Sequence, residues 1–280
     1  MKRFYPGRVV LSLLPKRLLT QTAGHFLRSS ASKALIPVFM RVYGIAESQA
    51  DRPWRAYGSL AEFFARKLPP GSRNFSVQEG DIVAPADGVI VELGRVETGR
   101  AVQIKGISYS IAALLADADA SLFEHGTYVV IYLSPRNYHR IHAPIAAVIR
   151  RIIHVPGTLY PVNRLGSTQI PGLYTKNERT ISWFARDDGA FALVKIGSTF
   201  VGSVKLASRL QCQTVNHRAR GEAQMILPRE VAVAQGEELA WFEFGSTVVL
   251  IFREGQAELA VAKGDIVQAL QPIGKWLGRQ

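Results

Sequence analysis

The sequence predicts an α+β protein, with N-terminal helices followed by a mainly antiparallel β-sheet body. Helical signals lie early, where Ser59-Leu60-Ala61-Glu62 forms a capping-box pattern ahead of Phe63-Phe64. From about residue 81 onward, short runs rich in valine, isoleucine, phenylalanine and tyrosine alternate with glycine, proline and Asp-Gly turn signals. Because 48% of the 280 residues are hydrophobic, the chain can bury a substantial core.

The individual elements follow from local signals. Pro69-Pro70-Gly71 is predicted to end the capping-box helix, and Ser110 is predicted to cap a second short helix over residues 111–115. The predicted strands are 89–93, 128–133, 146–154, 191–196, 200–204, 239–244 and 248–252.

The first 46 residues carry eight basic side chains and no acidic one. Apolar clusters at residues 9–14 and 35–40 lie among these charges, a pattern that favours amphipathic helices on a membrane surface. An organellar transit peptide or ordinary solvated helices would share this composition. No stretch has the roughly 20 apolar residues that span a bilayer. We therefore expect residues 1–50 to form a basic, membrane-associating helical segment and residues 51–280 to form the α+β domain.

The net charge of +12 favours an anionic partner, either nucleic acid or an anionic lipid surface. Charge alone does not distinguish these partners. The single cysteine, Cys212, excludes an intrachain disulfide and a multi-cysteine metal site.

Two histidines lie three residues apart in Tyr138-His139-Arg140-Ile141-His142, between two prolines and directly after a predicted strand. A metal site would need a third ligand, which no cysteine or nearby carboxylate supplies. Acid–base catalysis suits histidine better because its pKa lies near neutrality. Asp87, in Pro85-Ala86-Asp87-Gly88, is by itself typical of a turn.

Three Gly-Ser-Thr triplets occur, at residues 166–168, 197–199 and 245–247. The first is followed by an ordinary loop, whereas Ser198 and Ser246 each interrupt strand-like runs on both sides. The residues alone do not choose between Ser198 and Ser246.

Taken together, five motifs in one order resemble the bacterial phosphatidylserine decarboxylase family. They are Glu62-Phe63-Phe64, Pro85-Ala86-Asp87-Gly88, Tyr138-His139-Arg140-Ile141-His142, Asn177-Glu178-Arg179 and Phe244-Gly245-Ser246-Thr247. The likeness covers nearly the whole chain, including the basic N-terminus, which argues against a removable transit peptide.

The resemblance implies self-cleavage between Gly245 and Ser246, into a beta chain (1–245) and an alpha chain (246–280). The family's usual cleavage motif is Leu-Gly-Ser-Thr, from which Phe244 departs. The tetrapeptide Leu165-Gly166-Ser167-Thr168 matches that motif but lies where the family has no processing serine. The Ser198 triplet matches a buried family strand. Ser246 is therefore expected to become a pyruvoyl group, which is the expected cofactor, with no metal.

The resemblance also implies the roles of the side chains. His142 would be the base that activates Ser246, Asp87 would orient His142, and His139 would bind substrate and protonate the carbanion. The pyruvoyl ketone would form a Schiff base with phosphatidylserine and act as the electron sink for its decarboxylation to phosphatidylethanolamine and CO2.

Two other functions use the same residues differently. A serine hydrolase acting on lipid esters could employ Asp87, His142 and Ser246 without self-cleavage, although no Gly-x-Ser-x-Gly motif surrounds Ser246. A non-catalytic basic module would explain the charge but not the ordered motifs.

The expected partners are phosphatidylserine, an anionic membrane surface and the two cleaved chains, without nucleic acid; the resemblance also allows a homodimer. The expected location is peripheral, on the cytoplasmic face of the bacterial inner membrane.

Overall fold

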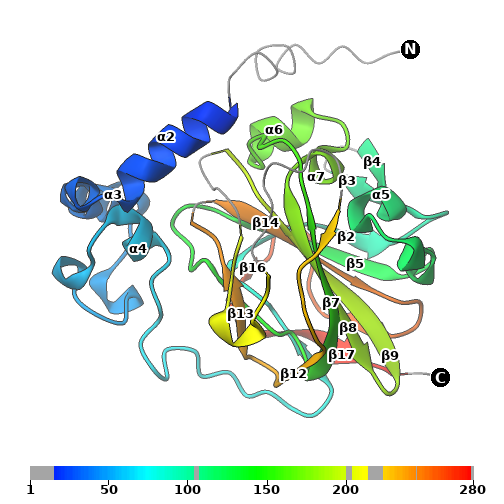
Figure 1. Ribbon diagram of the computed structural model, residues 1–280. Helices are drawn as coiled ribbons and strands as arrows, with labels where there is room; N and C mark the ends of the chain where they lie inside the picture. The colour runs from blue at the N-terminus through cyan, green and yellow to red at the C-terminus, as the bar shows by residue number, and fades with distance from the viewer. Residues whose placement is uncertain (1–15, 104–106, 200–203, 214–222, 244, 279–280) are drawn as a thin grey trace.

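The computed structural model describes residues 16–103, 107–199, 204–213, 223–243 and 245–278. Helices α2, α3 and α4 lie on one side of a larger β body (Figure 1). All strand pairs in this part of the chain are antiparallel. The predicted α+β class, with N-terminal helices and a mainly antiparallel sheet body, is confirmed.

The N-terminal helices share a small core of their own. They are α2 (Lys16–Arg28), η1 (Ser30–Leu35), α3 (Ile36–Tyr43), η2 (Glu47–Gln49), η3 (Trp54–Ala56) and α4 (Leu60–Phe64). Their buried apolar residues are Ile36, Ile45, Ala50, Tyr57, Leu60 and Phe63. We call residues 16–66 the helical module. Its core includes residues on both sides of position 50, and the domain boundary stays a prediction.

The cap of α4 is confirmed, because the Ser59 hydroxyl accepts a hydrogen bond from the amide of Glu62 at 3.2 Å. The carboxylate of Glu62 reaches back one residue further than in a capping box, to the amide of Gly58 at 2.7 Å. The predicted end of this helix is wrong, since α4 ends at Phe64, well before Pro69. The carbonyl of Ala65 instead accepts a hydrogen bond from Nε of Arg140.

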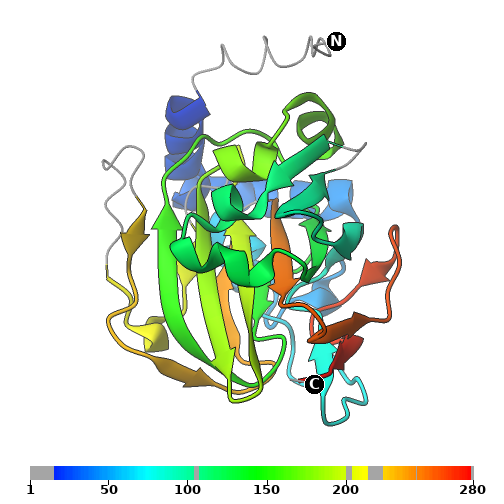
Figure 2. The same cartoon turned by 90° about the vertical axis from the view of Figure 1, so that its right-hand side faces the viewer.

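The main sheet has nine strands in the described part of the chain, in the order β11-β7-β8-β9-β14-β5-β2-β16, with β12 also paired to β7 (Figure 2). Their bounds are β11 (Gln224–Met225), β7 (Ala147–Val155), β8 (Arg179–Arg186), β9 (Gly189–Ile196), β14 (Ser246–Phe252), β5 (Thr127–Leu133), β2 (Gly88–Arg95), β16 (Ile266–Val267) and β12 (Val231–Val233). Strand β14 lies between β5 and β9, and every residue in it is buried.

Each face of the main sheet is covered by a different layer. One face packs against α5 (Ile111–Leu115), η5 (Ala118–Phe123), α6 (Arg164–Gln169) and α7 (Leu173–Lys176), together with the hairpin β3 (Arg100–Gln103) and β4 (Ile107–Ser110). The other face packs against two small sheets, β10-β13-β6 and β1-β17-β15. Their strands are β10 (Lys205–Leu206), β13 (Glu238–Trp241), β6 (Arg140–His142), β1 (Asp81–Val83), β17 (Pro272–Trp276) and β15 (Ala257–Leu259), with η6 (Ser208–Leu210) nearby.

Most strand predictions are confirmed by β2, β5, β7, β9, β13 and β14, and Ser110 caps α5 as predicted. Residues 200–203 of one predicted strand lie outside the described residues. Strand β8 was not predicted. Its residues 179–184 are buried between β7 and β9. Thr180-Ile181-Ser182-Trp183 alternates polar and apolar residues, so a signal for this strand was present in the sequence.

Candidate active site

Ser246 is the first residue of β14, where it pairs with Leu133 at the end of β5. Its side chain is fully buried, and Oγ has no hydrogen-bond partner among the described residues. The preceding Gly245 has no positive φ, and a Cβ there would lie 3.4 Å from the carbonyl oxygen of Leu133. The packing of this state therefore does not itself require glycine at position 245.

The other two candidate serines occupy different environments. Oγ of Ser198 accepts a hydrogen bond from the amide of Val162 at 3.3 Å. Ser167 is buried within α6, and a Cβ on Gly166 would lie 1.6 Å from the carbonyl oxygen of Pro161. Close packing against Pro161 therefore explains why this Leu-Gly-Ser-Thr tetrapeptide has a glycine, and no cleavage is needed to explain it.

His139 lies between β5 and β6, and His142 is the last residue of β6. The segment that leads to them begins beside Ser246 because β5 pairs with β14. His139 is fully buried and stacks on the ring of Phe64 with a centroid distance of 4.1 Å. Its Nε2 lies 3.0 Å from the carbonyl oxygen of Ser134, so Nε2–H is the donor. Burial lowers the pKa of His139 to about 3, and the positive charge of Arg66 adds to this effect. His139 is therefore neutral at physiological pH.

His142 is held by two hydrogen bonds from its ring. Nδ1 lies 2.8 Å from the carbonyl oxygen of Gly236, which makes Nδ1–H the donor. Nε2 lies 3.0 Å from the hydroxyl of Tyr138 and accepts a hydrogen bond from it. Burial lowers the pKa of His142 below its ordinary value. The nitrogen that can serve as a base is therefore Nε2.

Asp87 lies in the turn between β1 and β2, at the same end of the sheet as Ser246. A Cβ on the following Gly88 would lie 2.5 Å from the carbonyl oxygen of Tyr132, so this turn requires glycine to approach β5. The carboxylate of Asp87 accepts hydrogen bonds from Nη2 of Arg73 and, at 2.8 Å, from the amide of Ala269.

The ends of three neighbouring strands thus place the predicted residues at one edge of the sheet. The amide of His142 donates to the carbonyl oxygen of Pro85 at 2.8 Å, which brings the histidine segment beside the Asp87 turn. The side chains of Asp87, His142 and Ser246 are, however, not hydrogen-bonded to one another in the described structure. Asp87 is bound to Arg73, His142 to Tyr138 and Gly236.

Sequence reasoning assigned no role to Arg73 or Tyr138, although both hold predicted site residues. Tyr138 lies within the quoted histidine motif, and its spacing of four residues from His142 was the available signal. Arg73 is one of 34 lysines and arginines, and nothing in the surrounding sequence distinguishes it from the others.

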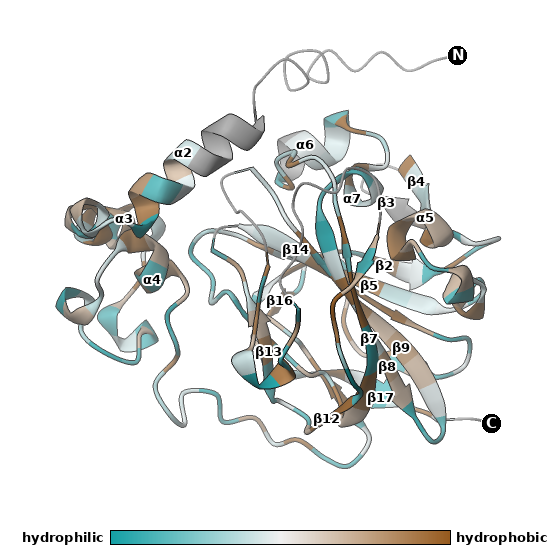
Figure 3. Ribbon diagram, in the orientation of Figure 1, coloured by the Kyte–Doolittle hydropathy of each residue, from teal (hydrophilic) through white to brown (hydrophobic). Residues whose placement is uncertain are grey.

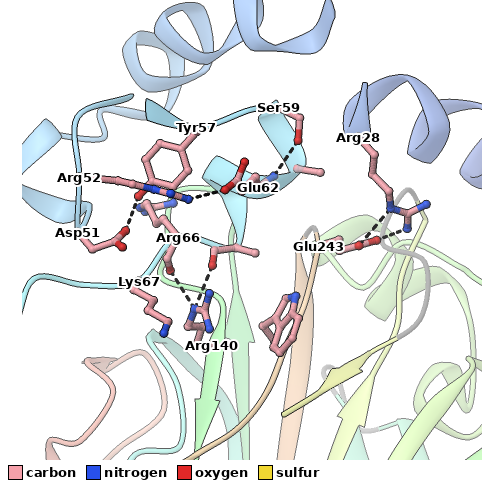
Figure 4. A pocket seen from close by; sticks show the side chains of 13 residues that line it. Arg28, Asp51, Arg52, Tyr57, Ser59, Glu62, Arg66, Lys67, Arg140 and Glu243 are labelled. Carbon is pink, nitrogen blue, oxygen red and sulfur yellow. Dashed lines mark hydrogen bonds and ion pairs between the residues drawn. The ribbon is translucent and has the colours of Figure 1, made fainter. Parts of the chain in front are cut away.

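Two pockets border this region. One, of about 280 Å³, is lined by residues that include Lys67, Arg73, Tyr138 and His142. The other, of about 490 Å³, lies between the helical module and strands β6 and β13 (Figure 4).

Across the described residues, no group of three or more histidine, cysteine, aspartate or glutamate side chains could hold a metal ion. No helix in the described part of the chain is long and apolar enough to cross a bilayer.

Comparisons with known proteins show the family to which the chain is related. The family model described as phosphatidylserine decarboxylase matches residues 60–275. Three relatives are named phosphatidylserine decarboxylase proenzyme. The one from Brevibacillus brevis is 36% identical over 94% of both chains, and the one from Anaeromyxobacter sp. is 38% identical over 94% of this chain and 96% of the relative. The one from Delftia acidovorans is 41% identical over 86% of both chains.

These matches define an enzyme of the decarboxylase class, a carbon–carbon lyase. The chain belongs to the phosphatidylserine decarboxylase family. The predicted resemblance is thereby confirmed, and the matches give no support to a serine hydrolase.

Proposed function

We propose that this chain decarboxylates phosphatidylserine to phosphatidylethanolamine after converting its own Ser246 into a pyruvoyl group. The observation that carries the proposal is the position of Ser246. Its buried Oγ lies at the start of a central strand, directly after Gly245, with no partner among the described residues. A buried hydroxyl without a partner is uncommon and is expected where chemistry uses it.

Maturation follows from these two residues. Oγ of Ser246 attacks the carbonyl carbon of Gly245, and the peptide bond becomes an ester as the amine of residue 246 leaves. β-Elimination then breaks the ester and releases a chain that ends in the carboxylate of Gly245. Addition of water to the resulting dehydroalanine expels ammonia and leaves a ketone at residue 246. That ketone would supply the electron sink for the loss of CO2 from the amino lipid.

His142 is the proposed base for the hydroxyl of Ser246. In the described state Nε2 accepts a hydrogen bond from the hydroxyl of Tyr138. This hydrogen bond must break before Nε2 can take the proton of Ser246. Asp87 is proposed to stabilise the resulting imidazolium, for which it must share its carboxylate between His142 and Arg73. His139 is proposed to protonate the substrate carbon after CO2 departs. Its proton lies on Nε2 and is donated to the carbonyl oxygen of Ser134, so this hydrogen bond must be released before Nε2–H can protonate the carbon.

We also propose that residues 1–50 hold the protein at an anionic membrane surface, on the cytoplasmic face of the bacterial inner membrane. Large apolar side chains are exposed along α2, η1 and α3, and α3 is mostly hydrophobic in Figure 3. They are Phe26, Leu35, Val38, Val42 and Tyr43. Basic residues between them would contribute about 1 kcal/mol each beside anionic lipids. A homodimer stays a prediction.

The test of this function combines intact mass with product analysis. Purified protein is expected to contain fragments of residues 1–245 and 246–280, and to release CO2 from phosphatidylserine vesicles. The variant Ser246→Ala should remain one chain and release none. A single uncut chain that releases CO2 at the wild-type rate would refute the proposal, and uncut protein that releases fatty acid would indicate a lipid hydrolase.

A further inference from the structure

The 490 Å³ pocket is large enough for a phospholipid headgroup and lies between the helical module and β6, the strand that ends at His142. Its walls come from α2, from the segment around α4, and from β6 and β13 (Figure 4). Trp241 and Glu243 line it from the strand side, and Glu243 lies two residues before Gly245.

The carboxylates around this pocket already have partners. Figure 4 shows the ion pairs Arg28–Glu243 and Arg52–Glu62, and the hydroxyl of Tyr57 donates to Asp51. Arg140 pairs with Glu238 at 2.5 Å. Two adjacent cations that line the pocket, Arg66 and Lys67, have no carboxylate partner among the described residues. The carboxylate of Asp51, whose partner is a neutral hydroxyl, offsets only one of these two charges, so the pocket keeps a net positive charge.

Arg66 is the more unusual of the two cations because its side chain is buried, at 2% exposure. Nε donates to the carbonyl oxygen of Gln49 at 3.1 Å, and Nη2 donates to the carbonyl oxygen of Arg136 at 3.1 Å. Nη1 has no acceptor in the described part of the chain. A buried guanidinium without a counter-charge is unfavourable, and an unsatisfied buried donor indicates a missing partner.

We propose that Arg66 and Lys67 bind a phosphate anion in this pocket, and that its source is the phosphodiester of the lipid substrate. This inference rests on the proposed function. A guanidinium matches the geometry of phosphate oxygens, and a neighbouring ammonium adds a second positive charge. Arg66 also donates to the backbone of the segment that carries His139, so a phosphate bound there would lie beside the reaction site.

The pocket has a route for such a ligand. The ion pair between Arg52 and Glu62 lies beside Arg66, and both of its side chains are more than 40% exposed. An exposed pair of this kind adds little stability, so a stronger anion can displace it. Arg28 links the pocket to α2, whose neighbour α3 carries the exposed apolar residues. A lipid whose acyl chains stay in the bilayer could therefore place its headgroup here.

The test measures binding of soluble probes to the purified full-length protein by calorimetry. Glycerophosphoserine carries the phosphodiester, inorganic phosphate carries the anion alone, and serine methyl ester carries neither. We expect Lys67→Gln to weaken glycerophosphoserine binding about tenfold, the order expected for one charge-assisted contact. Binding of serine methyl ester should not change. Lys263→Gln is the matched control, since Lys263 is exposed, pairs with Glu92 and lines neither pocket.

Arg66→Lys, which keeps the charge but loses the fork of donors, should weaken glycerophosphoserine binding at least as much as Lys67→Gln. If Arg66→Lys fails to fold, Lys67→Gln still decides the question because Lys67 is exposed. Preference for glycerophosphoserine over inorganic phosphate assigns the site to the lipid headgroup, and the reverse preference assigns it to free phosphate. Unchanged affinity in Lys67→Gln overturns the inference.

The same samples separate this inference from the proposed function. Loss of glycerophosphoserine affinity in a protein that releases no CO2 from phosphatidylserine would refute the function and leave the phosphate site standing. Normal CO2 release with an unchanged KM in both variants would leave the function standing and refute the site.

Discussion

Arg73 and Asp87 form an ion pair directly before the first residue of β2, with Nη2 of the arginine 3.1 and 2.8 Å from the two carboxylate oxygens. The amide of Ala269 donates to the same carboxylate. Nδ1 of His142 meanwhile donates to the carbonyl oxygen of Gly236. The carboxylate proposed to support His142 is thus bound to a different cation in this structure, and under the proposed mechanism Arg73 would compete with His142 for it.

This competition predicts opposite effects for the two partners of the ion pair. Asp87→Asn should slow self-cleavage at least about tenfold, because a neutral amide cannot stabilise the imidazolium of His142. Arg73→Gln should cleave at least as fast as wild type but lose about 3 kcal/mol of stability, because it leaves a largely buried carboxylate without its cation. Time courses of intact mass after cell-free synthesis measure both rates. Equal slowing in the two variants would show that the ion pair itself serves maturation.

The three Gly-Ser-Thr serines give a second prediction. Ser246→Ala should leave a full-length, inactive chain, because no other hydroxyl directly follows the Gly245 carbonyl. Ser167→Ala and Ser198→Ala should still yield fragments of the wild-type masses and serve as matched controls. Loss of cleavage in Ser167→Ala alone, with a normal circular dichroism spectrum, would move the cleavage site.

The histidines should separate maturation from turnover. His142→Ala should block or greatly slow cleavage, because general-base catalysis contributes about 100-fold or more. His139→Ala should cleave but release CO2 about 100-fold more slowly. Mass spectrometry and CO2 release distinguish the two steps. Normal turnover by His139→Ala would remove its assigned role.

The pH dependence of cleavage follows from the burial of His142. A base must be neutral to act, and burial lowers the pKa of His142, so protonation requires a pH below its ordinary value of 6.5. The cleavage rate should therefore stay level from about pH 8 to about pH 6.5 and fall only in more acidic buffer. A rate that already falls between pH 8 and pH 7 would contradict this assignment.

Lys195, buried in β9, gives a prediction about stability. Nζ donates to the hydroxyl of Ser182 at 2.7 Å, and burial lowers the pKa of Lys195 to about 7. The unfolded chain, with a pKa near 10.5, binds more protons between these values, so stability should rise with pH across this window.

The variant Lys195→Met removes this proton linkage. It should be about 2 kcal/mol more stable than wild type at pH 7, after allowance for the lost Ser182 hydrogen bond, and the difference should shrink toward pH 10. Urea unfolding at the two pH values measures it, with Lys263→Met as the exposed control. The same pH slope in variant and wild type would contradict the burial of a proton-linked amine.

Membrane association is tested on two equally exposed side chains. Val42 on α3 is 69% exposed and Ile266 on β16 is 65% exposed. Val42→Asp should weaken binding to phosphatidylserine vesicles about tenfold, the order of one lost apolar insertion. Ile266→Asp should bind like wild type in the same sedimentation assay. Equal losses would locate the membrane surface elsewhere.

The sequence predicted those helices and strands that depend on residues close together in the chain. Ser59 and Ser110 cap helices because their hydroxyls reach amides three residues ahead. Strands β5 and β14 were predicted because their apolar runs are bounded by turn residues. The end of α4 was predicted too late: the helix ends at Phe64, and the carbonyl of Ala65 accepts a hydrogen bond from Arg140, 75 residues away. No local pattern contains such a contact.

The site divides in the same way. Asp87 and His142 were predicted as site residues through motifs, and this prediction stays untested. The Asp-Gly turn signal agrees with the close approach of Gly88 to β5. The partners of these residues could not be predicted, since Gly236 is 94 residues from His142 and Ala269 is 182 residues from Asp87. Their pairing depends on the small sheets that fold back over the main sheet.

The central place of β14 has a consequence for the cleavage proposed above. Residues 246–280 contribute β14 between β5 and β9, β16 beside β2, and β17 beside β1. If the chain is cut after Gly245, this short fragment would stay paired with four strands of the longer one. The two fragments should then migrate together in native gels and separate only in denaturant, so a cut at this position would cost the protein neither half.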